Sequence, residues 1–282
     1  MTALRARLSE PELVQYRERG YVVPSFRLPA ERIADLRRTL DELIRANPGV
    51  PPEHLVNVHI EGRTPEGMQG SADFLALAKD PAILDMVEQV IGADIIVWAC
   101  AIFNKPGGSA KDIPWHQDGH YWPIRPLANC TVWIALDRSD TGNGCLRVIP
   151  GSHRGEVLHA HLTEERADSL FTQRIEDAAF DPRAAVDLVL DPGQMSLHDV
   201  FLIHGSEANH SPRRRAGVAI RYMPASSVFE RQLMAPSSAT GVRVDFSARP
   251  IWLMRGIDRS GRNDFSIGHH APGGQGDHAG TD

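Results

Sequence analysis

QMSLHDVFLIHGSEANHSPRRRAGVAIRYMP, residues 194–224, contains two β-rich runs that a polar turn separates. The first run ends at His204, and the second begins just after Arg215. Runs rich in Val, Ile, Phe and Tyr are typical of strands, and Asn, Ser and Pro between them are typical of a turn. We therefore expect two strands that become sheet neighbours if the turn is tight.

Similar short runs precede this stretch, namely DIIVWACAIF at 94–103, CTVWIALD at 130–137 and CLRVIP at 145–150. Clusters of Gly, Pro, Asn and Asp separate the runs. Many short strands without helices between most of them favour a sandwich or barrel over a sheet with crossover helices. The sequence therefore predicts a mainly β protein with flanking helices.

A helical pattern occurs before the β-rich part. Apolar residues recur at three- and four-residue spacing between Ser9 and Asn47, as at Ile33, Leu36 and Leu40. We expect one domain over 1–282, with these parts: a helical N-terminal region at about 9–93, a core at about 94–225 with a helical insertion at about 163–185, a C-terminal segment at 226–267 and a flexible tail at 268–282.

The bulk composition narrows the class of protein. A chain of 282 residues that is 42% apolar and 23% charged can bury a full core. Its net charge of -6 makes nucleic acid and anionic membranes poor partners. The N-terminus has no apolar secretory core, no stretch is long enough to span a bilayer, and the three cysteines fit buried thiols. We therefore expect a cytoplasmic protein that is a monomer or a homodimer.

WHQDGHYWP, residues 115–123, holds the first candidates for chemistry. On a strand, His116 and Asp118 would point to the same face, side by side. An imidazole and a carboxylate in this arrangement form half of a facial triad, which holds Fe(II) and leaves coordination positions open. A hydrogen-bonded polar pair without metal explains the same residues, so this stretch leaves both interpretations open.

His204 and Arg215 extend the pattern. A third ligand at the end of another strand would complete the triad. Arg215 follows His204 by eleven positions, where its guanidinium could project into the same cavity and bind a carboxylate through two hydrogen bonds. The alternative for Arg215 is a solvated position in the run Arg213–Arg215.

These residues stand in blocks that resemble a known family. The blocks are FNKPGG, WHQDGHYW, TVWIALD, GNGCLRVIPGSHRGE and PGQMSLHDVFLIHGSEANHSPRRRAGVAIRYMP. They are similar to the phytanoyl-CoA dioxygenase family of Fe(II)/2-oxoglutarate oxygenases. The resemblance covers most of the chain and implies a double-stranded β-helix, a cupin-like jelly roll.

The resemblance also implies a set of site residues. It places His116, Asp118 and His204 on iron. Arg215 would bind the distal carboxylate of 2-oxoglutarate with help from Thr131. Two further residues, Asn104 and Ser206, are expected to contact the same cofactor. Family members that halogenate lack the carboxylate ligand, so the presence of Asp118 favours hydroxylation or a related oxidation.

The substrate side of the site is less constrained by sequence. We expect Tyr121 and Trp122, next to the metal loop, to wall the substrate pocket, and His120 to lie behind the metal or to face the substrate. Core packing is the alternative for the aromatic residues. The expected substrate is a small metabolite or natural-product intermediate. Dioxygen is the co-substrate, and ascorbate is a possible aid to turnover.

Two other functions remain open at this point. A jelly roll can be a non-catalytic ligand-binding module with a bound metal. The same triad could also hold zinc in a hydrolase. Succinate release separates the oxygenase from both, because neither alternative consumes 2-oxoglutarate.

Overall fold

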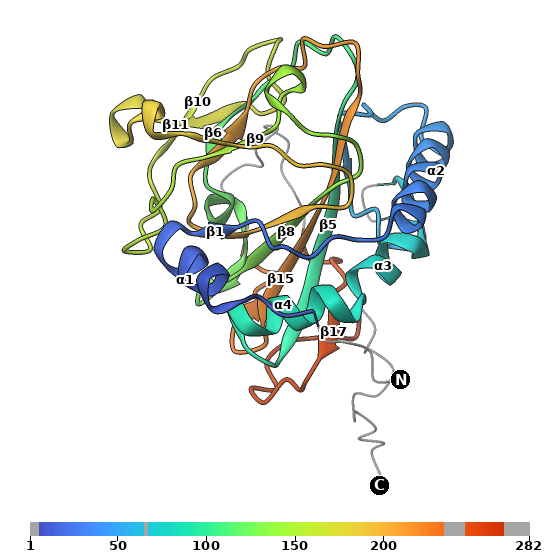
Figure 1. Ribbon diagram of the computed structural model, residues 1–282. Helices are drawn as coiled ribbons and strands as arrows, with labels where there is room; N and C mark the ends of the chain where they lie inside the picture. The colour runs from blue at the N-terminus through green and yellow to red at the C-terminus, as the bar shows by residue number, and fades with distance from the viewer. Residues whose placement is uncertain (1–5, 65–66, 234–245, 268–282) are drawn as a thin grey trace, which may run out of the picture.

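Two antiparallel sheets face each other in the computed structural model, which describes residues 6–64, 67–233 and 246–267 (Figure 1). In the large sheet, the strands lie in the order β1 (Tyr21–Val22), β13 (Met195–Asp199), β8 (Cys130–Ala135), β15 (Arg215–Pro224), β5 (Ile95–Lys105) and β17 (Trp252–Arg255), and β2 (His54–Val56) also pairs with β5. The small sheet has the order β12 (Val186–Leu188), β9 (Leu146–Val148), β14 (His204–Ser206) and β6 (Ile113–His116). This architecture confirms the expected jelly roll.

Four helices flank the large sheet: α1 (Glu10–Arg19), α2 (Ala30–Ala46), α3 (Ala72–Ala78) and α4 (Pro81–Ile91). Local sequence fixes their ends. Ser9 and Glu12 form a capping box at the start of α1, and Gly20 ends it in the left-handed region. The predicted apolar face of α2 is buried in the cluster that the helices share with the outer face of the large sheet. The expectation of N-terminal helices is confirmed, although short strands interrupt them.

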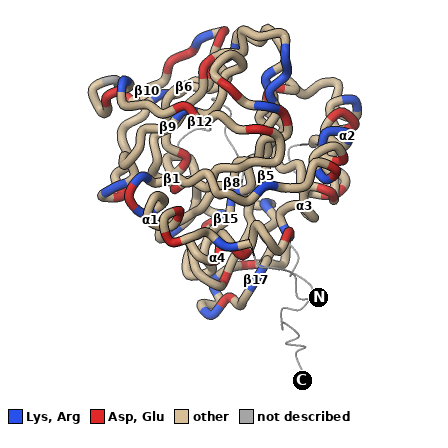
Figure 2. Tube along the Cα trace, viewed as in Figure 1, with Lys and Arg blue, Asp and Glu red and all other residues tan. Residues whose placement is uncertain are grey.

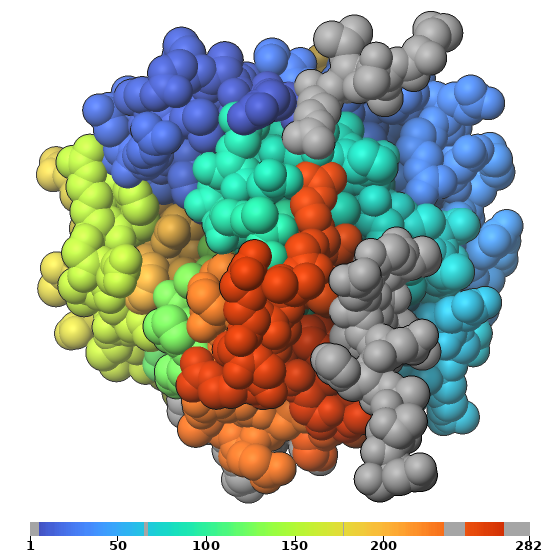
Figure 3. Space-filling model, turned by 90° about the horizontal axis from the view of Figure 1, so that it is seen from below, coloured from blue at the N-terminus to red at the C-terminus, as the bar shows by residue number. Residues whose placement is uncertain are grey.

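The C-terminal segment lies against the helices. In Figure 3, which shows the molecule from below, residues of this segment in orange-red lie beside the teal surface of α3 and α4. Arg255 at the end of β17 donates hydrogen bonds to Asp85 and Glu88 of α4, at 2.8 and 2.6 Å. The predicted tail at 268–282 lies outside the described residues.

The expectation of a helical insertion at 163–185 is wrong, because this stretch contains a strand and short 3-10 turns in place of an α-helix. This stretch contains β11 (Gln173–Ile175), which pairs with β10 (His161–Thr163), and two single turns of 3-10 helix, Asp177–Ala179 and Pro182–Ala184. Pro182 has no backbone N–H and would break an α-helix that ran through it. The remaining short strands form two antiparallel pairs: β3 (Gly62–Arg63) pairs with the next strand, β4 (Gln69–Gly70), and β7 (Ile124–Arg125) pairs with the distant β16 (Val228–Phe229).

Strand β15 separates the core from the cavity. Val218, Ile220 and Tyr222 point toward the helices and belong to the main hydrophobic cluster. The alternate residues, Arg215 and Arg221 among them, face the space between the two sheets. The side chains that face the cavity therefore all lie on one face of this strand.

The surface shows no single-sign field over the described residues. Figure 2 shows Lys and Arg interspersed with Asp and Glu along the trace. Among the described residues, no helix is long and apolar enough to cross a membrane. The three cysteines, Cys100, Cys130 and Cys145, are free and buried, as expected.

Candidate metal centre

His116, Asp118 and His204 meet in the space between the sheets. β14 pairs with β6 so that His204 lies directly opposite His116. The Nε2 atom of His116 lies 3.7 Å from Asp118 Oδ1, and the Nε2 atom of His204 lies 4.0 Å from Asp118 Oδ2. One ligand atom from each of the three lies within 4.8 Å of the others, and all three residues are buried. The set could hold one metal ion.

The route by which Asp118 reaches this place differs from the expectation. β6 ends at His116, and Asp118 begins a 3-10 helix, Asp118–Tyr121. The two residues therefore do not share a strand face. The turn of the 3-10 helix, rather than the period of a strand, brings the carboxylate back toward the imidazole.

Backbone carbonyls orient both imidazoles. The Nδ1 atom of His116 lies 2.8 Å from the carbonyl oxygen of Pro114, and the Nδ1 atom of His204 lies 2.9 Å from that of Leu202. A carbonyl can only accept, so each Nδ1 carries the proton and each Nε2 has a free lone pair on the side of Asp118, where a metal ion would lie. Burial lowers the pKa of His204 to about 3, which keeps this ring neutral. Neutral imidazoles with free Nε2 atoms suit a divalent transition metal.

Asp118 is ionised in this setting. Burial opposes its ionisation, but the neighbouring imidazole of His116 and the positive charge of Arg221 hold its pKa well below the usual range. The donor set is therefore two nitrogens and one anionic oxygen. These donors fit Fe(II) in the 2-His-1-carboxylate arrangement.

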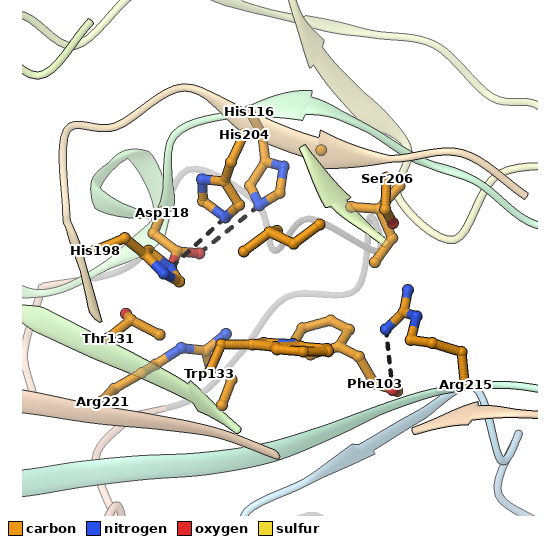
Figure 4. Close-up of a pocket in the computed structure, with 14 residues that line it drawn as sticks. Phe103, His116, Asp118, Thr131, Trp133, His198, His204, Ser206, Arg215 and Arg221 are labelled. Carbon is orange, nitrogen blue, oxygen red and sulfur yellow. Dashed lines mark hydrogen bonds and ion pairs between the residues drawn. The ribbon is translucent and has the colours of Figure 1, made fainter. Parts of the chain in front are cut away.

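A cavity of about 460 Å³ extends from the triad between the sheets. Figure 4 shows the triad on one side and Trp133 as the floor, with Arg215 and Arg221 reaching in from opposite ends.

Arg215 occupies one end of the cavity without an acidic partner among the described residues. Only 2% of its surface is exposed. Its Nη1 donates to the carbonyl of Phe103 at 3.3 Å, and its guanidinium lies 5.5 Å from the centroid of the Trp133 ring. Burial lowers its pKa to about 10. Its Nε and the Oγ of Ser206 are buried without a hydrogen-bond partner in the described structure. A carboxylate supplied by a ligand would satisfy both groups.

The neighbouring arginines are occupied elsewhere. Arg213 pairs with Asp140 at 2.9 Å on the surface. Arg214 pairs with Asp137 and Asp41, at 2.8 and 2.6 Å. Arg215 is thus the member of the run that faces the cavity. It reaches the cavity from the large sheet, opposite His204 on the small sheet, so the expectation that their strands are sheet neighbours is wrong.

Two expected cofactor residues lie elsewhere. Asn104 is adjacent to Phe103 on β5, and the alternation of the strand turns Phe103 toward the cavity and Asn104 away from it. Thr131 lines the cavity but lies opposite Arg221, six residues along β15 from Arg215. The expectation for Asn104 and the pairing of Thr131 with Arg215 are therefore wrong, because sequence did not reveal the strand register.

The aromatic residues after the metal loop form a wall behind the cavity. Trp122 packs edge-on against Trp98, with ring centroids 4.7 Å apart. Tyr121 belongs to the same apolar cluster. His120 stacks on His161 at 4.0 Å and is half-buried. Tyr121, Trp122 and His120 are not among the residues that line the cavity surface.

Three cavity residues were not singled out from sequence. His198 is buried, and its ring centroid lies 5.1 Å from that of His204. Trp133 fits either a wall or a core in the sequence and forms the floor in the structure. Arg221 shares the strand parity of Arg215, a signal that could have identified it.

Comparison with known proteins follows this geometry. Residues 16–217 match the family model described as phytanoyl-CoA dioxygenase (PhyH). The chain belongs to the PhyH family. Within it, this PhyH chain is 35% identical over 152 residues to the peroxisomal phytanoyl-CoA dioxygenase of Bos taurus, covering 52% of the chain and 44% of that protein. It is 31% identical over 153 residues to a probable alpha-ketoglutarate-dependent hypophosphite dioxygenase of Stutzerimonas stutzeri, covering 54% and 53%. The aligned part thus spans about half the length of these PhyH relatives.

Solved structures agree with the PhyH fold. The apo form of ThoJ, a non-heme monooxygenase, superposes with a TM-score of 0.67 at 25% identity, covering 87% of this chain and 84% of ThoJ. CytC3 with Fe(II) and alpha-ketoglutarate superposes with a TM-score of 0.63 at 20% identity, covering 92% and 94%. At 20% identity, the likeness to CytC3 supports the fold alone.

Proposed function

We propose that this protein is an Fe(II)- and 2-oxoglutarate-dependent dioxygenase that hydroxylates, or otherwise oxidises, an unactivated C–H bond of a small molecule. One observation carries the proposal. A buried triad of two oriented imidazoles and a carboxylate shares a cavity with a buried arginine that lacks an acidic partner in the described structure. Membership of the PhyH family supports the same reaction class.

Each residue has a defined task in this proposal. His116 and His204 hold the metal through Nε2, and Asp118 holds it through its carboxylate. Arg215 binds the distal carboxylate of 2-oxoglutarate through its guanidinium, and Ser206 donates its hydroxyl to the same group. When bound, Fe(II), 2-oxoglutarate and dioxygen supply the oxidising chemistry and yield succinate and carbon dioxide.

The protein positions the substrate and the metal ligands and excludes water from the site. Phe103 and Trp133 form apolar walls, so water is excluded where the substrate C–H bond must lie. The carbonyls of Pro114 and Leu202 hold the imidazoles in one tautomer throughout turnover.

The setting of the enzyme is part of the proposal. The whole chain acts as a single oxygenase domain, a monomer or homodimer in the cytoplasm, on a small metabolite or natural-product intermediate and without nucleic acid or membrane partners. The residues that line the cavity and the charges of both signs along the chain support this assignment. Light scattering of the purified chain measures its oligomeric state.

Succinate release tests the proposal. The protein with Fe(II), 2-oxoglutarate and dioxygen is screened against amino acids, amines, phosphonates and organic acids, with and without ascorbate. An oxygenase releases one succinate per product when the reaction is coupled. Metal binding without succinate release in every case would favour a binding module, and zinc-supported, oxygen-independent turnover would favour a hydrolase.

A further inference from the structure

Arg221 lies at the end of the cavity opposite Arg215 and has no role in the proposed chemistry so far. Its side chain reaches in from β15 beside Thr131 (Figure 4). Within the described structure, the guanidinium forms no hydrogen bond or ion pair, and its Nε is buried without a partner. Burying a cation without a partner costs free energy. An anionic ligand that paired with the half-buried guanidinium would recover this energy.

Two tryptophans hold the guanidinium in place. The Arg221 Cζ atom lies 5.1 Å from the centroid of the Trp122 ring and 5.8 Å from that of the Trp98 ring. Cation–π contacts of this kind fix the group but leave its N–H donors free. The arrangement depends on a β-bulge in β5. Arg221 pairs with Ala99 while Tyr222 pairs with Val97, so Trp98 is the extra residue.

Thr131 supplies a second donor at the same place. The indole N–H of Trp98 donates to Asn129 Oδ1 at 2.9 Å, and Asn129 Nδ2 donates to Thr131 Oγ1 at 3.2 Å. The Thr131 oxygen is thus used as an acceptor, and its hydroxyl proton remains available toward the cavity. Arg221 and Thr131 can therefore both donate to a group in the cavity.

Among the described residues, no acidic side chain forms an ion pair with the guanidinium of Arg221. Asp118 contributes to the local charge, but it forms no ion pair with Arg221. A metal bound to Asp118 would take up that negative charge and leave the guanidinium uncompensated. The Cα atoms of Arg215 and Arg221 are about 20 Å apart along the strand, so the two ends of the cavity are separate positions.

We propose that Arg221 and Thr131 bind an anionic group, a carboxylate, of the primary substrate. This inference rests on the proposed oxygenase function and adds a substrate class to it. The apolar side chains that line the cavity, Phe103, Trp133 and Ala219 among them, favour an apolar or aromatic body in that substrate. The substrate is thus a monoanionic molecule whose carboxylate is held away from the Arg215 end.

Binding of matched probes tests this assignment. The probes are phenylacetate and indole-3-acetate, each compared with its neutral amide. The protein is first loaded anaerobically with Fe(II) and saturating 2-oxoglutarate, which occupies Arg215. Calorimetry measures the affinity for each probe.

We expect at least one acid to bind more than tenfold tighter than its amide. Arg221→Gln should remove this preference, Arg221→Lys should keep part of it, and Thr131→Val should weaken acid binding several-fold, since each removes donors to the anion. Affinity for Fe(II) and 2-oxoglutarate should change less than about threefold in Arg221→Gln, because the assigned partner is the substrate.

Two results would overturn the assignment. In one, the wild type binds acids and amides equally or binds neither. In the other, Arg221→Gln weakens 2-oxoglutarate as strongly as loss of Arg215 does, which would place Arg221 with the co-substrate. Failure of the proposed oxygenase function is distinguishable, since it would appear before any probe is added, as a wild type that binds no Fe(II) or no 2-oxoglutarate.

Discussion

Arg215 is buried and has no acidic partner in the described structure, so its loss should have a large effect on the affinity for 2-oxoglutarate. A buried charge-assisted pair is worth roughly 2–5 kcal/mol when one partner is removed. Arg215→Ala should therefore weaken 2-oxoglutarate binding by about 30-fold to several thousandfold. Lysine at this position should restore binding only in part, because an ammonium cannot form two parallel hydrogen bonds. The measurement is the dissociation constant under anaerobic conditions with Fe(II) bound.

Arg213→Ala is the matched control for this prediction. Arg213 is exposed and pairs with Asp140, so its removal should change the affinity for 2-oxoglutarate less than about threefold. Arg214 is unsuitable as a control, because its pairs with Asp137 and Asp41 make its loss a change in stability. Equal sensitivity of Arg213 and Arg215 would contradict the placement of the distal carboxylate.

The triad gives a second prediction at this scale. Asp118→Asn or His116→Ala should abolish Fe(II) binding and turnover, since each removes one of three ligands. His210→Ala, at an exposed histidine, should leave both unchanged. Calorimetry in the absence of metal should show folded variants with unfolding free energies within about 1–3 kcal/mol of the wild type. Normal turnover by either ligand variant would exclude the assigned centre.

Single residues were the part of the site most open to prediction from sequence. The types and spacing of His116, Asp118, His204 and Arg215 made them candidates, and the family resemblance implied their roles and that of Ser206. Asn104 could not be placed correctly, since one step along β5 reverses the face of a side chain. The sequence contains no direct record of that register.

At the scale of elements, Gly217 on β15 controls the floor of the cavity. A Cβ atom at this position would lie 2.1 Å from the Trp133 ring, so the ring or the strand must shift. Gly217→Ala should destabilise the protein by about 1–3 kcal/mol through overpacking. Because Trp133 lies beneath Arg215, the same change should weaken 2-oxoglutarate binding.

Gly49→Ala tests whether this effect is local. A Cβ atom at Gly49 would meet no atom within 4 Å, so its substitution should leave both quantities almost unchanged. Chemical denaturation and 2-oxoglutarate titration of the two variants measure them. A Gly217→Ala protein as stable and as competent as Gly49→Ala would show that Trp133 has room to move.

Elements were predicted unevenly. The amphipathic face of α2 and the long strands were evident from periodicity, because a single face of each is buried. The charged residues of 163–185 favour a solvated helix, but the pairing of β10 with β11 and the presence of Pro182 prevent one. The bulge at Trp98 has no sequence signal of its own, as an extra residue in a strand of apolar residues leaves the composition unchanged.

For the whole molecule, ligands should act on stability through mass action. A ligand at a concentration of about 100 times its dissociation constant stabilises the folded state by about 2.7 kcal/mol. For a chain of this size, that corresponds to a rise in melting temperature of roughly 5–10 °C. We expect a rise of this order with Fe(II), removed by a chelator, and a further rise with 2-oxoglutarate in the wild type but not in Arg215→Ala.

Scanning calorimetry checks this prediction. The melting temperature is measured without metal, with Fe(II), with Fe(II) and a chelator, and with Fe(II) and 2-oxoglutarate. The metal-free protein should remain folded, because apolar clusters on both sides of the large sheet, not the metal, hold the sheets and helices together. Unfolding on chelation alone would mean that the metal is structural. A 2-oxoglutarate effect that survives loss of Arg215 would mean that the anion binds elsewhere.

The general architecture was predictable from many short strands with turn residues between them. The strand order was not, since β8, β15 and β5 are sheet neighbours although residues 106–129 and 136–214 separate them in the chain. Long-range pairing of this kind depends on the packing of the complete chain. The resemblance to a family supplied what local pattern could not.

The bulge in β5 also bears on how such enzymes diversify. The metal ligands and Arg215 depend on no bulge in this strand, whereas Trp98 reaches Arg221 through one inserted residue. A descendant that lost this residue would keep its oxidising centre and lose the contact of Trp98 with Arg221, because Val97 would still pair with Tyr222 and the rest of the strand would keep its two faces. Substrate preference could then change by a single-codon deletion, while the catalytic machinery is inherited intact.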